Sequence, residues 1–292
     1  MDTITAVQQL AAPWLDGVML VITYLGDAET YIALLVVVYL AINPEVGRRL
    51  GVYLLLSATA NAQFKEIFAT PRPFVLAPEV ARGEMAVGTA PGASFPSGHA
   101  QMSATFWGYL ALQVRRPWFW LLALLLIALV SLSRVYLGVH FPVDIWGGLA
   151  IAVGVLALAL LADRYLVPVL ARWPVWLLVT LGLLVPLALQ LLLPPANMFL
   201  GGLAALLTAP LLLIHRVPRT VGRRITVATL GLLLVAATWV GLEQLPETVR
   251  DHPFGEFAQY LVLGYVGLAL VPYLARVTGL APGPVDSGPD TH

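Results

Sequence analysis

Two histidines in this sequence lie beside residues that could take part in phosphoryl transfer. His140 and Asp144 are one helical turn apart, so the carboxylate could accept a hydrogen bond from one imidazole nitrogen and leave the other free to attack phosphorus. His99 follows Ser97 and Gly98 where an apolar run begins, and it could protonate the leaving oxygen and then activate water. We therefore predict that His140 is a nucleophile, that Asp144 orients it, and that His99 is the general acid and base.

Three cations occur near these histidines in the sequence and could bind phosphate oxygens. Lys65 and Arg72 are separated by six residues, and Pro73 fixes the turn that follows them. Arg134 precedes His140. One compact ammonium and two planar guanidinium groups suit the oxygens of a phosphate monoester or diphosphate, so we predict that all three bind substrate phosphate.

Backbone and hydroxyl groups could complete such a site. Ser97 and Gly98 open one apolar segment, and Pro142 suits the first helical position of another, so free N–H groups could point at an anion. The lack of a side chain at Gly98 would let phosphate approach the backbone closely. The hydroxyl of Ser133 could contact phosphate or could simply cap backbone. Because cations and amides could stabilise the equatorial oxygens, we expect no metal and no other cofactor.

The composition indicates what kind of protein positions these residues. The chain has 292 residues, of which 59% are hydrophobic and 11% charged, and its mean hydropathy is +0.85. Soluble domains carry roughly 25% charged residues. Apolar stretches of about 20 residues, the length that crosses a bilayer, recur along the whole chain. We predict an all-α integral membrane protein with about nine transmembrane helices, at 22–42, 48–68, 98–114, 117–135, 143–164, 174–193, 197–214, 224–242 and 257–276.

The candidate residues all fall in the first half of the chain. We expect an interfacial segment at 1–21, a catalytic helical core at 22–165, a C-terminal extension of four transmembrane helices at 166–276 and a disordered tail at 277–292. The absence of cysteine excludes disulfides and thiolate metal sites. A net charge of zero gives no reason to expect nucleic acid as a partner.

The basic residues indicate the orientation in the membrane. Lys65 is the only lysine among 16 basic residues, and the first 47 residues contain none of the 16. Most of the arginines lie in alternate connections between predicted spans, and the positive-inside rule places those connections in the cytoplasm. We therefore expect the N-terminus and the active site on the outer side and the C-terminus in the cytoplasm. The expected location is a bacterial inner membrane, where the outer side is the periplasm. Five basic residues fall on the outer side: Lys65, Arg72, Arg82, Arg134 and Arg250.

Three segments resemble the signature motifs of the type 2 phosphatidic acid phosphatase (PAP2) superfamily, which includes vanadium haloperoxidases and glucose-6-phosphatases. The motifs K-x6-RP, PSGH and SR-x5-H-x3-D correspond to residues 65–73, 96–99 and 133–144, in the family's order. The resemblance covers residues 48 to about 164. It implies a metal-independent phosphatase with a phosphohistidine intermediate and the roles given above for His140, His99, Asp144, Lys65, Arg72, Arg134, Ser97, Gly98 and Ser133.

A site where apolar spans meet outer water would admit a lipid sideways from the bilayer, which favours a lipid phosphate as substrate. Undecaprenyl diphosphate, phosphatidylglycerol phosphate, phosphatidic acid and lipid A phosphate all fit, and a soluble phosphate ester stays open. Two other functions are also open, a lipid phosphotransferase that uses the same phosphohistidine and a non-catalytic transporter of lipid phosphates. The sequence gives no oligomeric state.

Two charged residues outside the motifs each have two interpretations. Asp27 lies near the outer end of the first predicted span, where it could pair with a site arginine or be a solvated interfacial charge. Arg82 lies in the connector of 22 residues at 74–95, which could be a short lid over the site or a passive surface loop.

Overall fold

The computed structural model describes residues 1–9, 11–192, 200–250 and 252–283. Within these residues all regular secondary structure is helical, which confirms the predicted all-α class. The start of the predicted span at 197–214 and most of the predicted disordered tail at 277–292 lie outside the described residues.

The helices form two compact units. The first consists mainly of Met1–Ile32 and Val52–Trp173. It contains α1 (Asp2–Gln8), α2 (Pro13–Tyr24), most of α4 (Pro44–Phe68), α5 (Pro73–Leu76), η2 (Pro78–Val80), α6 (Glu84–Gly88), α7 (Gly98–Val114), α8 (Pro117–Tyr136), α9 (Pro142–Leu161), η3 (Ala162–Leu166) and α10 (Val167–Leu170).

The second unit contains Ala33–Gly51, Pro174–Gln190 and the described residues from Leu200 onward. Its helices are the second half of α3 (Ala28–Val37), η1 (Val38–Ile42), most of α11 (Val175–Leu192), α12 (Leu200–Leu212), α13 (Val221–Glu243), α14 (Glu247–Arg250), α15 (Pro253–Tyr265), η5 (Val266–Leu270) and α16 (Val271–Val277). Residues 33–51 belong to this unit, although the sequence analysis assigned residues 33–51 to the 22–165 segment. The proposed functional boundaries at 22–165 and 166–276 stay predictions.

Five helices among the described residues are long and apolar enough to cross a membrane, and this number becomes six if the bent pair α1 and α2 is one span. They are Pro117–Tyr136, Pro142–Leu170, Val175–Leu192, Val221–Glu243 and Phe254–Val277. Ala28–Ile42 and Leu200–Leu212 are apolar but shorter. These helices indicate a membrane protein, and the number of nine spans stays a prediction.

The predicted span at 22–42 is not one helix. The chain leaves α2 after Tyr24, turns at residues 25–27, and begins α3 at Ala28. The carbonyl of Tyr24 accepts a hydrogen bond from Thr30 Oγ1 at 2.8 Å, and the N–H of Gly26 donates to Thr23 O at 2.8 Å, so the turn is internally bonded. This break places Asp27 at the end of the first unit where the predicted site residues lie.

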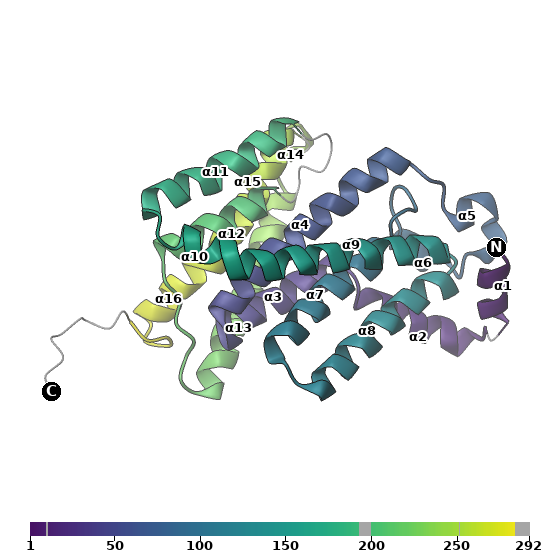
Figure 1. Ribbon diagram of the computed structural model, residues 1–292, viewed down its shortest axis with the longest axis horizontal. Helices are drawn as coiled ribbons and strands as arrows, with labels where there is room; N and C mark the ends of the chain where they lie inside the picture. The colour runs from purple at the N-terminus through teal and green to yellow at the C-terminus, as the bar shows by residue number, and fades with distance from the viewer. Residues whose placement is uncertain (10, 193–199, 251, 284–292) are drawn as a thin grey trace, which may run out of the picture. The chain divides into compact units, whose positions relative to one another are not determined.

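The connections of α7, α8 and α9 explain why helix ends gather at one place. Only Arg115 and Arg116 separate α7 from α8, so the two helices must run antiparallel, and residues 137–141 return the chain from α8 into α9. Figure 1 shows these three helices side by side. As a result α8 ends where α9 begins, on the side where α7 starts. Hydrogen bonds from Arg134 to Thr23 and from Lys65 to Ala93 bring the ends of α2 and α4 to the same place. The three motif segments occupy these helix ends.

The connector at 74–95 is folded and packed. It forms α5, η2 and α6, and these short helices lie near α1 and the end of α8 (Figure 1). Arg82 donates to both carboxylate oxygens of Asp16 at 3.1 and 2.8 Å, and Tyr136 Oη donates to the same carboxylate at 2.6 Å. Gly138 has a φ of +72°, and a Cβ there would collide with the carbonyl of Val80. These contacts fix the connector beside the α8–α9 turn.

Candidate active site

His140 lies between two partners that define its tautomer. Its Nδ1 is 3.2 Å from Asp144 Oδ2, and its Nε2 is 3.0 Å from Nη1 of Arg72. A guanidinium group has only donors, so Nε2 must be the accepting nitrogen and Nδ1 must carry the proton that faces Asp144. Nε2 therefore has its lone pair free of a proton, which is the state that a nucleophile needs.

Asp144 is held by donors that the sequence did not reveal. Its Oδ2 accepts from Ser94 Oγ at 2.5 Å and from the backbone N–H of Phe141 at 2.8 Å. The N–H of Phe141 therefore faces Asp144, and this helix start is capped by its own carboxylate. Ser94 is fully buried. No spacing pattern marks Ser94, because its partner is 50 residues away in the sequence.

Arg72 is buried, and protein groups accept from every N–H of its guanidinium. Its Nε donates to Gly92 O at 2.9 Å, Nη1 faces Val139 O and His140 Nε2, and Nη2 donates to Pro91 O and Ala93 O at 2.8 and 3.0 Å. Lys65 Nζ donates to Ala93 O at 3.0 Å, so both cations share this carbonyl. A phosphate bound by Arg72 would have to replace at least one of these acceptors.

The surroundings of His140 keep its imidazole neutral. Burial lowers the pKa of His140 well below the usual 6.5, and the positive charges of Arg72, Arg134 and Lys65 lower it further. Burial also lowers the pKa of Arg72 to about 10, which leaves this guanidinium protonated at neutral pH. Arg72 contacts His140 directly, and Arg134 and Lys65 lie near enough for their charges to act on it.

Two predicted phosphate-binding residues have buried polar atoms without a partner among the described residues. Arg134 is fully buried, and its Nη1 donates hydrogen bonds to the hydroxyls of Thr23 and Thr89 at 2.5 and 2.8 Å. Its Nε has no acceptor among the described residues. Ser97 is fully buried and its hydroxyl is also unpaired. Because an unpaired buried donor costs about 1–3 kcal/mol, these two groups are suited to an anionic ligand.

The turn at residues 96–98 is held by a side chain of α4. Asn61 Nδ2 donates to Pro96 O at 3.3 Å and to Gln101 Oε1 at 2.8 Å. A Cβ on Gly98 would lie 3.3 Å from Asn61 Oδ1, so the glycine also admits this close approach. The N–H of Ser97 donates to Asp144 O at 2.9 Å and joins the second motif to the third. Sequence reasoning did not identify Asn61.

Ser133 has its hydroxyl on the backbone. Its Oγ donates to Val130 O at 2.7 Å, one turn earlier in α8, and the residue is fully buried. The sequence left open whether this hydroxyl contacts phosphate or caps backbone, and in the structure it bonds to backbone. A phosphate contact by Ser133 stays a prediction.

His99 has an acidic partner. Its Nε2 lies 2.6 Å from Asp27 Oδ1, and the two side chains are 14% and 20% exposed. Asp27 was expected to be a solvated charge or the partner of an arginine, and in the structure it pairs with the predicted general acid.

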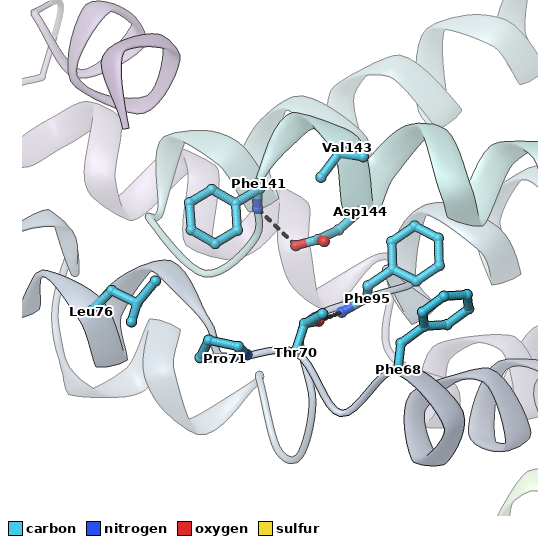
Figure 2. A pocket seen from close by; sticks show the side chains of 8 residues that line it. All are labelled: Phe68, Thr70, Pro71, Leu76, Phe95, Phe141, Val143 and Asp144. Carbon is cyan, nitrogen blue, oxygen red and sulfur yellow. Dashed lines mark hydrogen bonds between the residues drawn. The ribbon is translucent and has the colours of Figure 1, made fainter.

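An apolar pocket adjoins Asp144. Its volume is about 390 Å³. Figure 2 shows the residues at the start of α9 on one side and, on the other, residues at and after the end of α4. The rings of Phe68 and Phe95 are in edge contact, with their centroids 4.9 Å apart. Polar atoms contribute little to its lining, which consists of Phe68, Thr70, Pro71, Leu76, Phe95, Phe141, Val143 and Asp144. The pocket could hold the apolar part of a ligand whose polar group reaches the histidines.

Among the residues that the structure describes, no group of three or more histidine, cysteine or acidic residues is arranged to hold a metal ion. The expectation of a metal-independent reaction stays a prediction.

Comparisons with known proteins match the region that carries these residues. A family model described as the PAP2 superfamily matches residues 47–168. Phosphatidylglycerophosphatase B of Bacillus subtilis is 30% identical over 152 residues, which cover 48% of this chain and 70% of that protein. A putative undecaprenyl-diphosphatase of Escherichia coli is 32% identical over 143 residues, which cover 48% of this chain and 69% of that protein.

A third relative has a higher sequence identity over a shorter match. An undecaprenyl-diphosphatase of Sulfolobus acidocaldarius is 46% identical over 56 residues, which are 19% of this chain and 26% of that protein. The chain thus matches about a quarter of the length of this relative. The family model begins after Asp27 and Thr23, so these two contacts of the site lie outside the matched region.

Proposed function

The chain belongs to the PAP2 superfamily, and from this membership we propose that it is a membrane-embedded phosphatase that hydrolyses a lipid phosphate through a phosphohistidine on His140. The observation that carries the proposal is the position of His140 between Asp144 and Arg72, which leaves Nε2 unprotonated in a cluster of cations. A neutral imidazole beside cations is suited to attack a phosphate that those cations bind.

In the first step Nε2 of His140 attacks phosphorus as the bond between phosphorus and the leaving oxygen breaks. The electron pair of that bond passes to the leaving oxygen, which takes a proton from His99. Asp144 stabilises the positive charge that develops on the imidazole of His140. The product is a phosphohistidine and a lipid alcohol, or a lipid monophosphate when the substrate is a diphosphate.

In the second step water attacks the phosphohistidine. His99, now neutral, takes a proton from the water as the new oxygen–phosphorus bond forms and the bond to Nε2 breaks. Inorganic phosphate leaves, and both histidines return to their first state. Phosphate oxygens would be bound by Lys65, Arg72, Arg134, the hydroxyl of Ser97 and N–H groups of the first turn of α7 at Gly98, whereas Ser133 is a weaker candidate.

The pocket beside Asp144 supports a lipid as the substrate. Its aromatic and aliphatic lining could hold the first part of an acyl or prenyl chain while the phosphate reaches His140. A soluble phosphate ester has no long apolar chain that could bind to this surface. The relatives named for undecaprenyl diphosphate and phosphatidylglycerophosphate make these two lipids the first to test, with phosphatidic acid and lipid A phosphate after them.

We place the active site on the periplasmic side of a bacterial inner membrane, in a chain that crosses the bilayer about nine times with a cytoplasmic C-terminus, as the distribution of arginines indicates. The helices of 166–276 would then be a transmembrane extension of the catalytic core. The proposal includes no metal, no nucleic acid and no soluble cofactor.

The test is phosphate release by the detergent-purified protein from a panel of lipid phosphates in the presence of a chelator. We expect release from at least one lipid, with loss to background in His140→Ala and full activity in the control His252→Ala, which changes an exposed histidine. A phosphoryl group on the protein that is lost in acid and stable in base would identify the phosphohistidine. No release by the wild type, or unchanged release by His140→Ala, would refute the proposal; transfer of phosphate to a second lipid instead of water would indicate a phosphotransferase.

A further inference from the structure

The contact between Asp27 and His99 defines which nitrogen of His99 is available for proton transfer. Nε2 lies 2.6 Å from Asp27 Oδ1. An ionised carboxylate can only accept a hydrogen bond, so Nε2 carries a proton and Nδ1 is the nitrogen that can exchange a proton with substrate and water. A bond this short is typical of a charge-assisted pair.

The turn that carries Asp27 packs directly on the site residues. Gly26 is buried against His99, and a Cβ there would lie 2.9 Å from Cδ2 of the imidazole and 2.7 Å from Cγ1 of Val130. Two residues before the turn begins, Thr23 Oγ1 accepts a hydrogen bond from Nη1 of Arg134 at 2.5 Å. These contacts hold the chain just before Asp27, and the backbone of Asp27 itself is bonded to Tyr24 O and to the N–H of Tyr31. Asp27 is therefore carried by a packed turn when it pairs with His99.

We propose that Asp27 is a positioning residue for His99, which fixes the imidazole with Nδ1 toward the leaving oxygen and stabilises its protonated form. This inference rests on the proposed function and adds to it a residue outside the matched family region. The site then contains two histidine–aspartate pairs with complementary tasks. Asp144 supports a histidine that must be neutral before it reacts, and Asp27 supports one that must be protonated.

The other charges near His99 make this support necessary. Burial disfavours a positive charge on the imidazole of His99, and the charges of Arg134 and Lys65 disfavour it further. Asp27 is the acidic group that acts in the opposite direction. Without the carboxylate, the imidazolium would face two cations with no compensating anion, and a general acid would be lost.

The experiment compares two leaving groups in a single turnover. A long-chain alkyl phosphate has an alkoxide leaving group that needs a proton, whereas nitrophenyl phosphate has a leaving group that is stable without one. We expect Asp27→Asn to slow phosphorylation of His140 by the alkyl phosphate roughly 100-fold and by nitrophenyl phosphate less than roughly 10-fold. Equal slowing with both substrates, or no slowing with either, would overturn the proposal.

Two further variants separate positioning from folding. Glu29→Gln removes an exposed carboxylate two residues away and should leave both rates unchanged. In a His99→Ala background, Asp27→Asn should have no further effect, because a residue that acts through His99 loses its effect when His99 is absent. Additive losses in the double variant would contradict the inference.

A readout that does not need turnover separates this inference from the proposed function. In protein labelled with ¹⁵N-histidine, neutral His99 should have its proton on Nε2, and Asp27→Asn should abolish that preference while the Nδ1 proton of His140 is retained. If the wild type has this tautomer but releases no phosphate from any lipid, the proposed function fails and the pairing stands. If His99 has its proton on Nδ1, the positioning role fails whatever the activity is.

Discussion

Nη1 of Arg72 lies 3.0 Å from Nε2 of His140, so the cation predicted to bind substrate phosphate also contacts the lone pair predicted to attack it. The remaining N–H groups of Arg72 donate to the carbonyls of residues 91–93 and Val139. A phosphate that enters the site would take over part of this hydrogen bonding and would release Nε2 for attack. Binding of the substrate and exposure of the nucleophile would then be one event.

Arg72→Lys should lower kcat/KM by roughly 100-fold, because a lysine keeps the positive charge but loses the planar arrangement of donors and their several charged hydrogen bonds. Steady-state kinetics with the best lipid substrate would measure this. Arg48→Lys, at an arginine paired with Glu45 in the second unit, is the matched control and should be silent. Activity of Arg72→Lys near that of the wild type would show that the planar arrangement of guanidinium donors is not needed.

Ser94→Ala should lower kcat about tenfold with little change in KM, because Asp144 loses one charged hydrogen bond and orients His140 less firmly. Ser131→Ala is a suitable comparison, since it removes a buried hydroxyl of α8 that has no hydrogen-bond partner among the described residues. A rise in KM without a fall in kcat would mean that Ser94 contacts substrate instead.

The pH dependence should be bell-shaped, because His140 must be neutral while His99 must be protonated. The pKa of His140 is lowered by burial and by nearby cations, so activity should be lost on the acid side only well below pH 6.5, where His140 gains a proton. Profiles of kcat/KM against pH measure this limb. A profile that rises or falls in one direction only would contradict complementary roles for the two histidines.

The acid limb also reports the contribution of Lys65. Lys65→Gln removes a positive charge that lowers the pKa of His140, so the pKa should rise and the acid limb of the residual activity should move to higher pH. Lys65→Arg keeps the charge and should leave the limb in place. A limb that moves equally in both variants would exclude an electrostatic cause.

Phe68→Ala should raise KM for a long-chain lipid phosphate roughly tenfold and leave KM for a short-chain phosphate unchanged, because the ring lines the pocket beside Asp144. Phe64→Ala is the matched control on the same helix. Phe64 stacks on Phe68 at 6.1 Å but does not line the pocket. Equal effects on both substrates would remove the pocket from chain binding.

Local patterns in the sequence were sufficient for several parts of the fold and the site. The predicted segment at 98–114 coincides with α7, since a glycine start and an apolar run define a helix without help from distant residues. The pairing of His140 with Asp144 was predictable for the same reason, because four residues along the chain separate them. The family motifs identified the remaining cations by type and spacing.

Tertiary structure decided which other groups complete the site. Asp27 meets His99 across 72 residues and Ser94 meets Asp144 across 50, and no local periodicity relates such positions. The predicted span 22–42 breaks at residues 25–27, where Gly26 likewise packs against His99 and Val130, two residues far along the chain. The sequence by itself determined an all-α membrane protein with residues suited to phosphoryl transfer, because composition and short spacings carry that information. The partner of each histidine and the donors that hold it depend on which helix ends meet, and only the folded chain brings those ends together.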